Sequence, residues 1–182
     1  LLRQPPARGH RHVETVMNAQ NVTFTSDQIT ALFIDAAREG DTDLLTQFLD
    51  AGMAIDTPDS RGYTALIVAT YNGHADATRL LLDRGADTEA TDLKGATALS
   101  GVAFKGLTDI AKLLLDHGAQ VDHANHAGRT PLMFSIMFNR EDMARTLLAA
   151  GANPDLKDAD GVSARVLAER QLMSSLFTGI PA

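Results

Sequence analysis

Apolar residues recur along this chain with helical spacing, and a glycine follows each short run. The first run places four apolar side chains on one face of a helix: Ile29, Leu32, Phe33 and Ala36. Thr25 and Gln28 have the spacing of a capping box, so this helix is predicted to begin near Ser26. We expect it to end near Gly40, because glycine readily adopts the left-handed conformation of a helix C-terminal cap.

A second, shorter helix is predicted directly after this glycine. Asp41 and Asp43 place negative charge at the positive end of its dipole. Its apolar stripe consists of Leu44, Leu45, Phe48 and Leu49, and Gly52 is predicted to end it. The same pair of helices recurs later in the chain. The first helix of each pair carries small apolar side chains, and the second carries a run of leucines: Leu80–Leu82, Leu113–Leu115 and Leu147–Leu148.

Two sequence markers repeat with a constant period of 33 residues. The first is a glycine two places before a Thr or Ser, and it occurs at Gly62, Gly95, Gly128 and Gly161. The hydroxyl residues themselves stand where a helix N-cap is expected, at Thr64, Thr97, Thr130 and Ser163. The second marker is the glycine that ends each second helix, at Gly52, Gly85, Gly118 and Gly151. Such a period indicates stacked copies of one small unit that cannot bury its apolar face alone.

The markers divide the chain into a tail and five repeats. We expect an N-terminal tail (1–24), an N-terminal cap repeat (25–58), three fuller repeats (59–91, 92–124 and 125–157) and a C-terminal cap repeat (158–182). Each fuller repeat opens with Asp or Asn and has glycine at its fourth place, where a turn with positive φ is favourable. The second helix of the last repeat is cut short after Phe177.

The first 16 residues contain two prolines and a basic cluster but no apolar stretch of the kind found in a secretory signal. We interpret them as a flexible tail. Met17 is then a candidate for the natural start, with residues 1–16 left from cloning. A mature chain cut from a longer precursor is the alternative.

Composition and charge narrow the class of partner. Hydrophobic residues make up 45% of the chain and aromatic residues 5%, so the interior must consist mainly of Leu, Ala, Ile and Val. The formal net charge of −7 repels nucleic acids and anionic membranes, and neither is expected as a partner. There is no cysteine, which excludes disulfides and thiolate chemistry, and no run reaches the roughly 20 apolar residues of a membrane span.

The repeated motifs resemble those of the ankyrin repeat family over residues 27–177. They run in the order Asp-x-x-Gly-x-Thr-Ala/Pro-Leu, Gly-His-x-Asp and Leu-Leu-Leu-Asp-x-Gly-Ala. The resemblance implies an all-α solenoid of stacked helix-turn-helix units, joined by β-hairpin-like loops and offering a concave binding face. The chain departs from the family where Ala replaces Pro (Ala65, Ala98 and Ala164) and where His is replaced by Ile67, Ser100, Met133 and Val166. Asn139 stands where Gly73 and Gly106 end the neighbouring first helices, and Asn tolerates the left-handed conformation.

Ankyrin repeats usually contact partners through the hairpin tips and the exposed inner face of the first helix. By position, the hairpin places are Ser60, Arg61, Tyr63, Leu93, Lys94, Ala96, His126, Ala127 and Arg129. The inner-face places are Arg38, Tyr71, Phe104 and Met137, with Asn72, Lys105 and Phe138 beside them. The resemblance thus implies a partner-binding set of Arg38, Arg61, Tyr63, Tyr71, Asn72, Lys94, Phe104, Lys105, His126, Arg129, Met137 and Phe138.

Three large apolar residues follow one another on this face with the period of the repeat. We hypothesise that Tyr71, Phe104 and Met137 form an exposed ridge flanked by Arg38 and Lys105, a composition typical of binding hot spots. The alternative is that these side chains pack into hairpin stems or the next repeat.

Some residues of the chain are of types that bind metals or take part in catalysis. His117, His123 and His126 crowd one loop together with Asp122, and such residues can bind zinc. They lack the helical His-Glu-x-x-His signature, so we interpret them as polar residues at a solvated tip and expect no metal or cofactor. No phosphate loop or Gly-x-Ser-x-Gly motif is present, and pairs such as Asp158 and Asp160 fit turns, so an enzyme is not expected.

The function that the sequence favours is a non-catalytic protein–protein interaction module, a scaffold or accessory factor that is a monomer when free. An immunity-type inhibitor of a toxin or enzyme is the first alternative, which the acidic charge would suit if the target is basic. A small enzyme or metal-binding protein is the alternative of a different class. The absence of a visible signal favours the cytoplasm, with export as the alternative.

Overall fold

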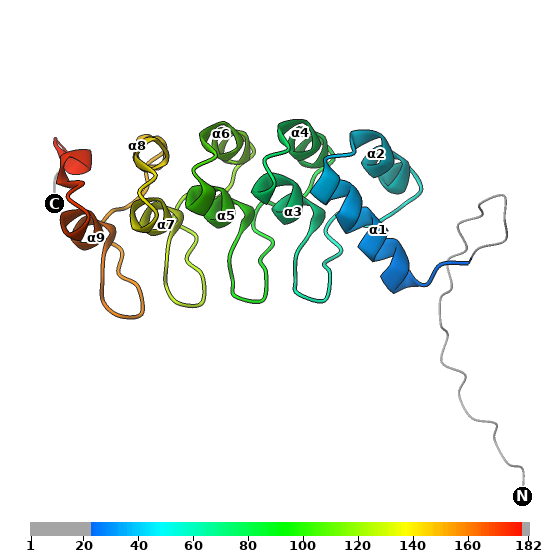
Figure 1. Ribbon diagram of the computed structural model, residues 1–182, viewed down its shortest axis with the longest axis horizontal. Coiled ribbons are helices and arrows are strands. Elements are labelled where there is room, and N and C mark those ends of the chain that lie inside the picture. Colours follow the sequence, from blue (N-terminus) through cyan, green and yellow to red (C-terminus); the bar gives the residue numbers. More distant parts are fainter. Residues whose placement is uncertain (1–22, 180–182) are drawn as a thin grey trace, which may run out of the picture.

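Short helices stack in two rows in the part of the chain that the structure, a computed structural model, describes, residues 23–179. The inner row consists of α1 (Ser26–Glu39), α3 (Ala65–Tyr71), α5 (Ala98–Lys105), α7 (Pro131–Met137) and α9 (Ala164–Arg170). The outer row consists of α2 (Thr42–Asp50), α4 (Ala75–Asp83), α6 (Thr108–Asp116) and α8 (Glu141–Ala149), followed by the 3-10 helix η1 (Ser174–Phe177). Long loops leave the inner row on the side away from the outer row (Figure 1).

The all-α prediction is confirmed. Within residues 23–179 the only β pairing is an isolated bridge between Lys157 and Ser163. No helix in this range has the length and hydropathy that a bilayer span requires. The predicted tail, 1–24, lies outside the described residues except for its last two.

Side-chain caps set where the inner helices begin, as the sequence predicts. Thr64, Thr97, Thr130 and Ser163 each accept a hydrogen bond from the backbone N–H three residues later. At α1, Thr25 and Gln28 form the reciprocal capping box, and Gly40 ends the helix at φ 71°. Each cap satisfies a backbone donor that has no partner inside the helix, which allows helices of seven or eight residues to begin sharply.

One oxygen closes each long loop into a hairpin. Oδ1 of Asp92 accepts hydrogen bonds from the backbone N–H groups of Lys94 (2.8 Å) and Ala96 (3.0 Å). The same pair of bonds recurs at the other three loop-opening residues, Asp59, Asn125 and Asp158. The loops are therefore preformed turns.

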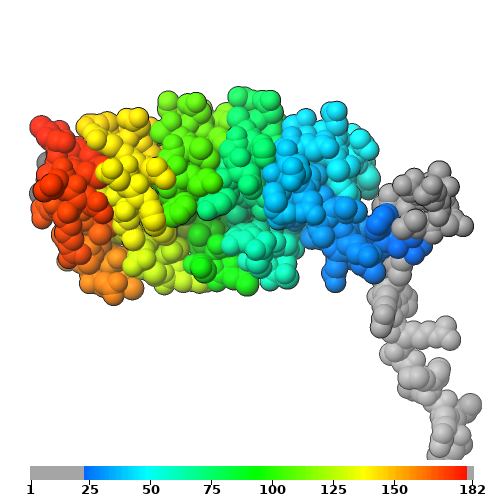
Figure 2. Space-filling model, viewed as in Figure 1, coloured from blue at the N-terminus to red at the C-terminus, as the bar shows by residue number. Residues whose placement is uncertain are grey.

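The core lies between the two rows and between successive helix pairs. Its fully buried leucines recur at one place in the first helix of each fuller repeat and at another in the second: Leu66, Leu99 and Leu132, then Leu81, Leu114 and Leu147. Helices of the inner row pack on their inner-row neighbours, and each also packs on the outer helix that follows it. In the space-filling view the sequence colours form successive bands across the body (Figure 2), in agreement with the packing of each helix pair on the next.

Hydrogen bonds join each repeat to the next at the loop bases. Asp56 accepts from the backbone N–H of Asp87 (3.0 Å), and Glu89 accepts from that of Gln120 (2.9 Å). Asp122 accepts from that of Asn153 at 3.0 and 3.1 Å. Because three acidic residues spaced by the repeat period make the same bond, this contact holds the register between successive repeats.

A second set of bonds joins the inner helices at their C-terminal ends. Nε2 of His74 donates to the carbonyl oxygen of Arg38 (2.7 Å), and Nε of Arg140 donates to that of Phe104 (3.1 Å). Both carbonyls belong to the last turn of an inner helix, where intrahelical partners are missing. The next repeat thus caps the helix before it.

The residue between the inner and outer helix of each repeat has a left-handed backbone. It is Gly40, Gly73, Gly106, then Asn139 (φ 56°) and finally Leu172 (φ 59°). The expected tolerance of Asn139 is confirmed. Leucine is unusual there because its Cβ crowds the following carbonyl, and the Leu172 side chain is 93% exposed, so burial does not compensate.

We predict that Leu172→Gly stabilises the protein. Relief of the left-handed conformation is worth about 1–2 kcal/mol, and the greater freedom of glycine in the unfolded chain offsets about 0.5–1 kcal/mol of this. The net gain of about 0.5–1 kcal/mol corresponds to a rise in Tm of about 1–4 °C. Urea unfolding and thermal melts measure it.

Leu172→Ala is the matched control, since it removes the same exposed side chain but keeps a Cβ at positive φ. It should give no comparable gain. A loss of stability in Leu172→Gly would show that the leucine is not strained.

Candidate functional site

Three aromatic rings lie against one another along the inner row. Tyr71 and Phe104 are stacked, with ring centroids 6.3 Å apart and planes 15° apart. Phe104 and Phe138 meet edge to face at 4.3 Å. Tyr71 and Phe138 are each about two-fifths exposed, at 41% and 42%. These residues, from α3, α5 and the end of α7, form what we call the aromatic strip.

The third ring of the strip comes from Phe138, and the reason is geometric. Nζ of Lys105 lies 4.6 Å from the centroid of the Tyr71 ring, in the repeat before it. Phe138 stands one period after Lys105 and leans in the same way over Phe104. Met137, which the sequence places in the ridge, ends α7 and is half-buried. The side chain just after the ridge position therefore covers the preceding ring.

A pocket of about 420 Å³ lies beside the strip, between the inner helices and the first two hairpins. We call it the inner pocket. Five residues of the predicted partner-binding set line it: Arg38, Arg61, Tyr63, Tyr71 and Asn72. Its remaining lining is Ile67, Val68, Asp92, Ala96, Thr97 and Gly101. Because Tyr71 belongs to both features, the pocket and the aromatic strip form one continuous surface.

The cations of this surface lie close to aromatic rings or carboxylates. The guanidinium carbon of Arg61 is 4.9 Å from the centroid of the Tyr63 ring, and its Nη2 is 3.6 Å from Oδ2 of Asp59. Arg38 pairs with Asp35 one turn earlier on α1. Asn72 donates from Nδ2 to the carbonyl oxygen of Val68 (2.8 Å) and is thereby held against α3.

The remaining predicted contacts lie on the hairpins. The backbone N–H of His126 donates to the carbonyl oxygen of Lys94 (3.0 Å), which links two hairpins. The His126 imidazole lies over Gly95, where an added Cβ would come 2.5 Å from Cδ2 of the ring. Arg129 faces the next hairpin, with Nε 3.7 Å from Oδ2 of Asp158. Two of these residues thus hold adjacent hairpins together and have less freedom to contact a partner.

Two residues that line the inner pocket were not predicted from the sequence. Val68 and Gly101 lie one period apart on α3 and α5, and neither was predicted as a site residue. A comparison of the repeats at this position could have shown Gly101 as the exception, because Val68 precedes it and Phe134 follows it by one period. The ring contact of Phe138 has no such indication in the sequence.

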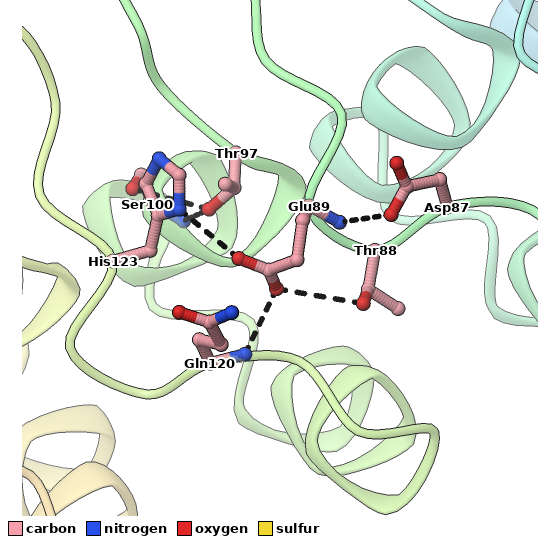
Figure 3. A network of polar contacts seen from close by, with 7 residues as sticks. All are labelled: Asp87, Thr88, Glu89, Thr97, Ser100, Gln120 and His123. Carbon is pink, nitrogen blue, oxygen red and sulfur yellow. Dashed lines mark hydrogen bonds and ion pairs between the residues drawn. The ribbon is translucent and has the colours of Figure 1, made fainter.

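The histidines that suggested a metal are dispersed. Nδ1 of His123 lies 3.0 Å from Oε2 of Glu89, while Nε2 of His117 lies 3.3 Å from Oδ1 of Asp83 in the outer row. Figure 3 shows Glu89 between His123 and the backbone nitrogen of Gln120. Among residues 23–179 no three His, Asp or Glu side chains gather closely enough to hold a metal ion. Here the acidic and imidazole groups join neighbouring repeats.

Asp122, in the same loop, carries a perturbed carboxyl group. Burial raises its pKa above the ordinary value of 3.8, and the hydrogen bond from the backbone N–H of Asn153 opposes this rise. Burial of the charged carboxylate therefore costs free energy, although the same group accepts the hydrogen bond that joins the two repeats. Its role is explained by stacking without invoking chemistry.

Comparison with known families agrees with this architecture. The family model described as ankyrin repeats, in three copies, matches residues 8–92 and residues 85–158. A search of curated proteins found no significant match.

We predict that Asp122→Asn stabilises the protein near neutral pH. The variant keeps an oxygen to accept from Asn153 but carries no charge. Because the folded-state pKa of Asp122 is raised, its contribution to stability is fully present below 3.8 and is lost as pH rises through the raised value. The advantage of Asp122→Asn should therefore shrink as the solution is acidified, which denaturant unfolding across pH measures.

Asp122→Ala is the control, because it removes both the charge and the oxygen that accepts the hydrogen bond from Asn153. It should be about 1 kcal/mol less stable than Asp122→Asn at every pH, since the Asn153 N–H loses its partner. A difference between Asp122→Asn and the wild type that does not change with pH would contradict the prediction.

Proposed function

Because the chain belongs to the ankyrin repeat family, we propose that it is a non-catalytic scaffold or accessory protein that binds one partner protein through its inner face. Ankyrin repeats are generally protein–protein interaction modules. The inner face is the exposed side of the inner row together with the hairpin loops (Figure 1). The free protein is proposed to be a monomer.

One observation carries this proposal: the aromatic strip continues into the inner pocket. Three aromatic side chains in contact with one another, of which Tyr71 and Phe138 are exposed, offer a rigid surface to a partner at small entropic cost. Lys105 lies over Tyr71 in the strip, and Arg61 lies over Tyr63 in the pocket. Aromatic and cationic side chains at the centre of a surface are the usual composition of a binding hot spot.

The stack also supports binding by being ordered in advance. The hairpins are closed by their own Asx bonds, and backbone bonds connect neighbouring hairpins: Leu93 to Arg61 (3.4 Å), His126 to Lys94 (3.0 Å) and Ala159 to Ala127 (2.9 Å). A surface that is ordered before association loses little conformational entropy on binding.

The competing function is inhibition of a basic enzyme, and the formal net charge of −7 supports it. The inner pocket, however, is lined by Arg38 and Arg61, with Asp92 as its one carboxylate among the described residues. Each of these arginines also faces an aspartate outside the lining, Asp35 or Asp59. The pocket therefore offers two guanidinium groups to a partner carboxylate, and local charge does not separate the two functions. Assay of a captured partner distinguishes the two functions, because an inhibitor lowers its activity and an accessory factor does not.

We predict that the triple variant Tyr71→Ala/Phe104→Ala/Phe138→Ala loses its partner while keeping its fold. Removal of a hot spot weakens binding by at least about 2 kcal/mol, or about 30-fold. The measurement is quantitative affinity capture from the organism of origin followed by mass spectrometry, with titration of the captured protein. Far-ultraviolet circular dichroism and the melting transition check that the stack remains folded.

The matched control replaces three exposed charged side chains of the outer row, Lys112→Ala/Asp116→Ala/Arg145→Ala. It should capture the same protein as the wild type. Equal capture by the triple aromatic variant, loss in the outer-row control, or capture of nothing by the wild type would each contradict the proposal.

A further inference from the structure

Gly101 is an unusual residue for the middle of helix α5. The equivalent positions of the other repeats carry Asp35, Val68, Phe134 and Leu167. Glycine inside a helix destabilises it relative to alanine, because the unfolded chain has more freedom to lose. Its backbone does not require glycine, since Gly101 is absent from the residues with positive φ.

Packing does not require glycine there either. A Cβ built at Gly101 would lie 3.4 Å from Cδ2 of Tyr71, an ordinary contact. Gly62 shows the opposite case, because its φ is +81° and a Cβ would lie 2.9 Å from the backbone nitrogen of Leu93. The fold therefore explains Gly62 and leaves Gly101 unexplained.

What the missing side chain creates is space in the inner pocket. Gly101 lines the pocket together with Val68, Ile67 and the Tyr71 ring. A Cβ at position 101 would meet the Tyr71 ring, which lines the same pocket. A volume of about 420 Å³ is within the usual range of pockets that bind small ligands.

The charges around this space select the occupant. Arg38 and Arg61 both line the pocket, and their present partners, Asp35 and Asp59, form ion pairs at the surface. The exposed pair of Arg38 with Asp35 contributes little, and the Arg61 guanidinium stays accessible beside the half-buried Asp59, so a carboxylate of a partner can bind either arginine. Asp92, the carboxylate in the lining, already accepts two backbone hydrogen bonds through Oδ1.

Building on the proposed function, we propose that Gly101 opens a socket for one aromatic side chain of the partner, with a carboxylate next to it bound by Arg38 or Arg61. The ring lies against Tyr71 and Val68, and the carboxylate lies at the rim. The partner segment is thus acidic and carries an aromatic anchor. Gly101 determines specificity at the expense of helix stability.

The test uses N-acetylphenylalanine, which carries one ring and one carboxylate, as the probe of the socket. Nuclear magnetic resonance titration of the labelled full chain should show shifts at the amides of Tyr71, Asn72 and Gly101, with a dissociation constant of about 1 mM. N-acetylphenylalanine amide, which lacks the charge, should bind several-fold more weakly, and acetate should leave these amides unshifted. Equal binding of the acid and the amide, or shifts confined to Phe138 and Lys105, would overturn the proposal.

Gly101→Ala separates the socket from the fold. The variant should raise Tm by about 2–4 °C and weaken the probe at least about fivefold, because its methyl group occupies the space. Leu172→Gly is the matched control, expected to raise Tm without changing probe affinity. Unchanged probe affinity in Gly101→Ala would overturn the proposal.

The two proposals fail differently. If the triple aromatic variant loses the partner while Gly101→Ala binds both partner and probe normally, the socket is wrong and the inner face still binds. If partner capture is independent of the aromatic strip, the proposed function fails, whatever the probe shows.

Discussion

The stacking of one helix pair on the next is the interaction on which the rest of the structure depends. Most of the helices have seven to nine residues, a length at which an isolated helix is not stable in water. Each gains its stability from leucines such as Leu66, Leu99 and Leu132, which are fully buried within the stack. Because this burial exists only between neighbours, every repeat must hold its position relative to the next.

The hydrogen bonds between repeats maintain that position. They connect residues 31, 32 or 36 apart: an acidic side chain to a backbone N–H, one hairpin backbone to the next, and a side chain of one repeat to the last turn of the inner helix before it. The acidic residues Asp56, Glu89 and Asp122 are occupied in this way, and Asp59, Asp92 and Asp158 close hairpins. Many of the carboxylates that make the chain acidic thus act in the framework, and Arg38, Arg61 and Lys105 remain on the inner face.

A rigid framework lets positions that are not needed for stacking vary in chemistry. The aromatic strip and the inner pocket occupy such positions, and they combine residues from four inner helices and two hairpins. Gly101 and Leu172 both weaken the fold locally, but they differ in place. Leu172 lies at the C-terminal end of the stack, whereas Gly101 lies at the centre of the surface that carries the binding residues, which is why it has a functional interpretation.

The sequence by itself determined the period, the helix boundaries, the caps and the all-α class, because each depends on contacts within a few residues. Thr64 caps its own helix and Gly40 ends one wherever the stack leads. The sequence also indicated which face of the stack would carry Tyr71 and Phe104. Tertiary structure alone decided that the Phe138 ring packs on Phe104, that Gly101 lines a pocket, and that His126 covers Gly95. These features depend on contacts between a side chain of one repeat and the repeat that precedes it. The 33-residue alignment shows which positions are equivalent, but it does not show which of them are in contact.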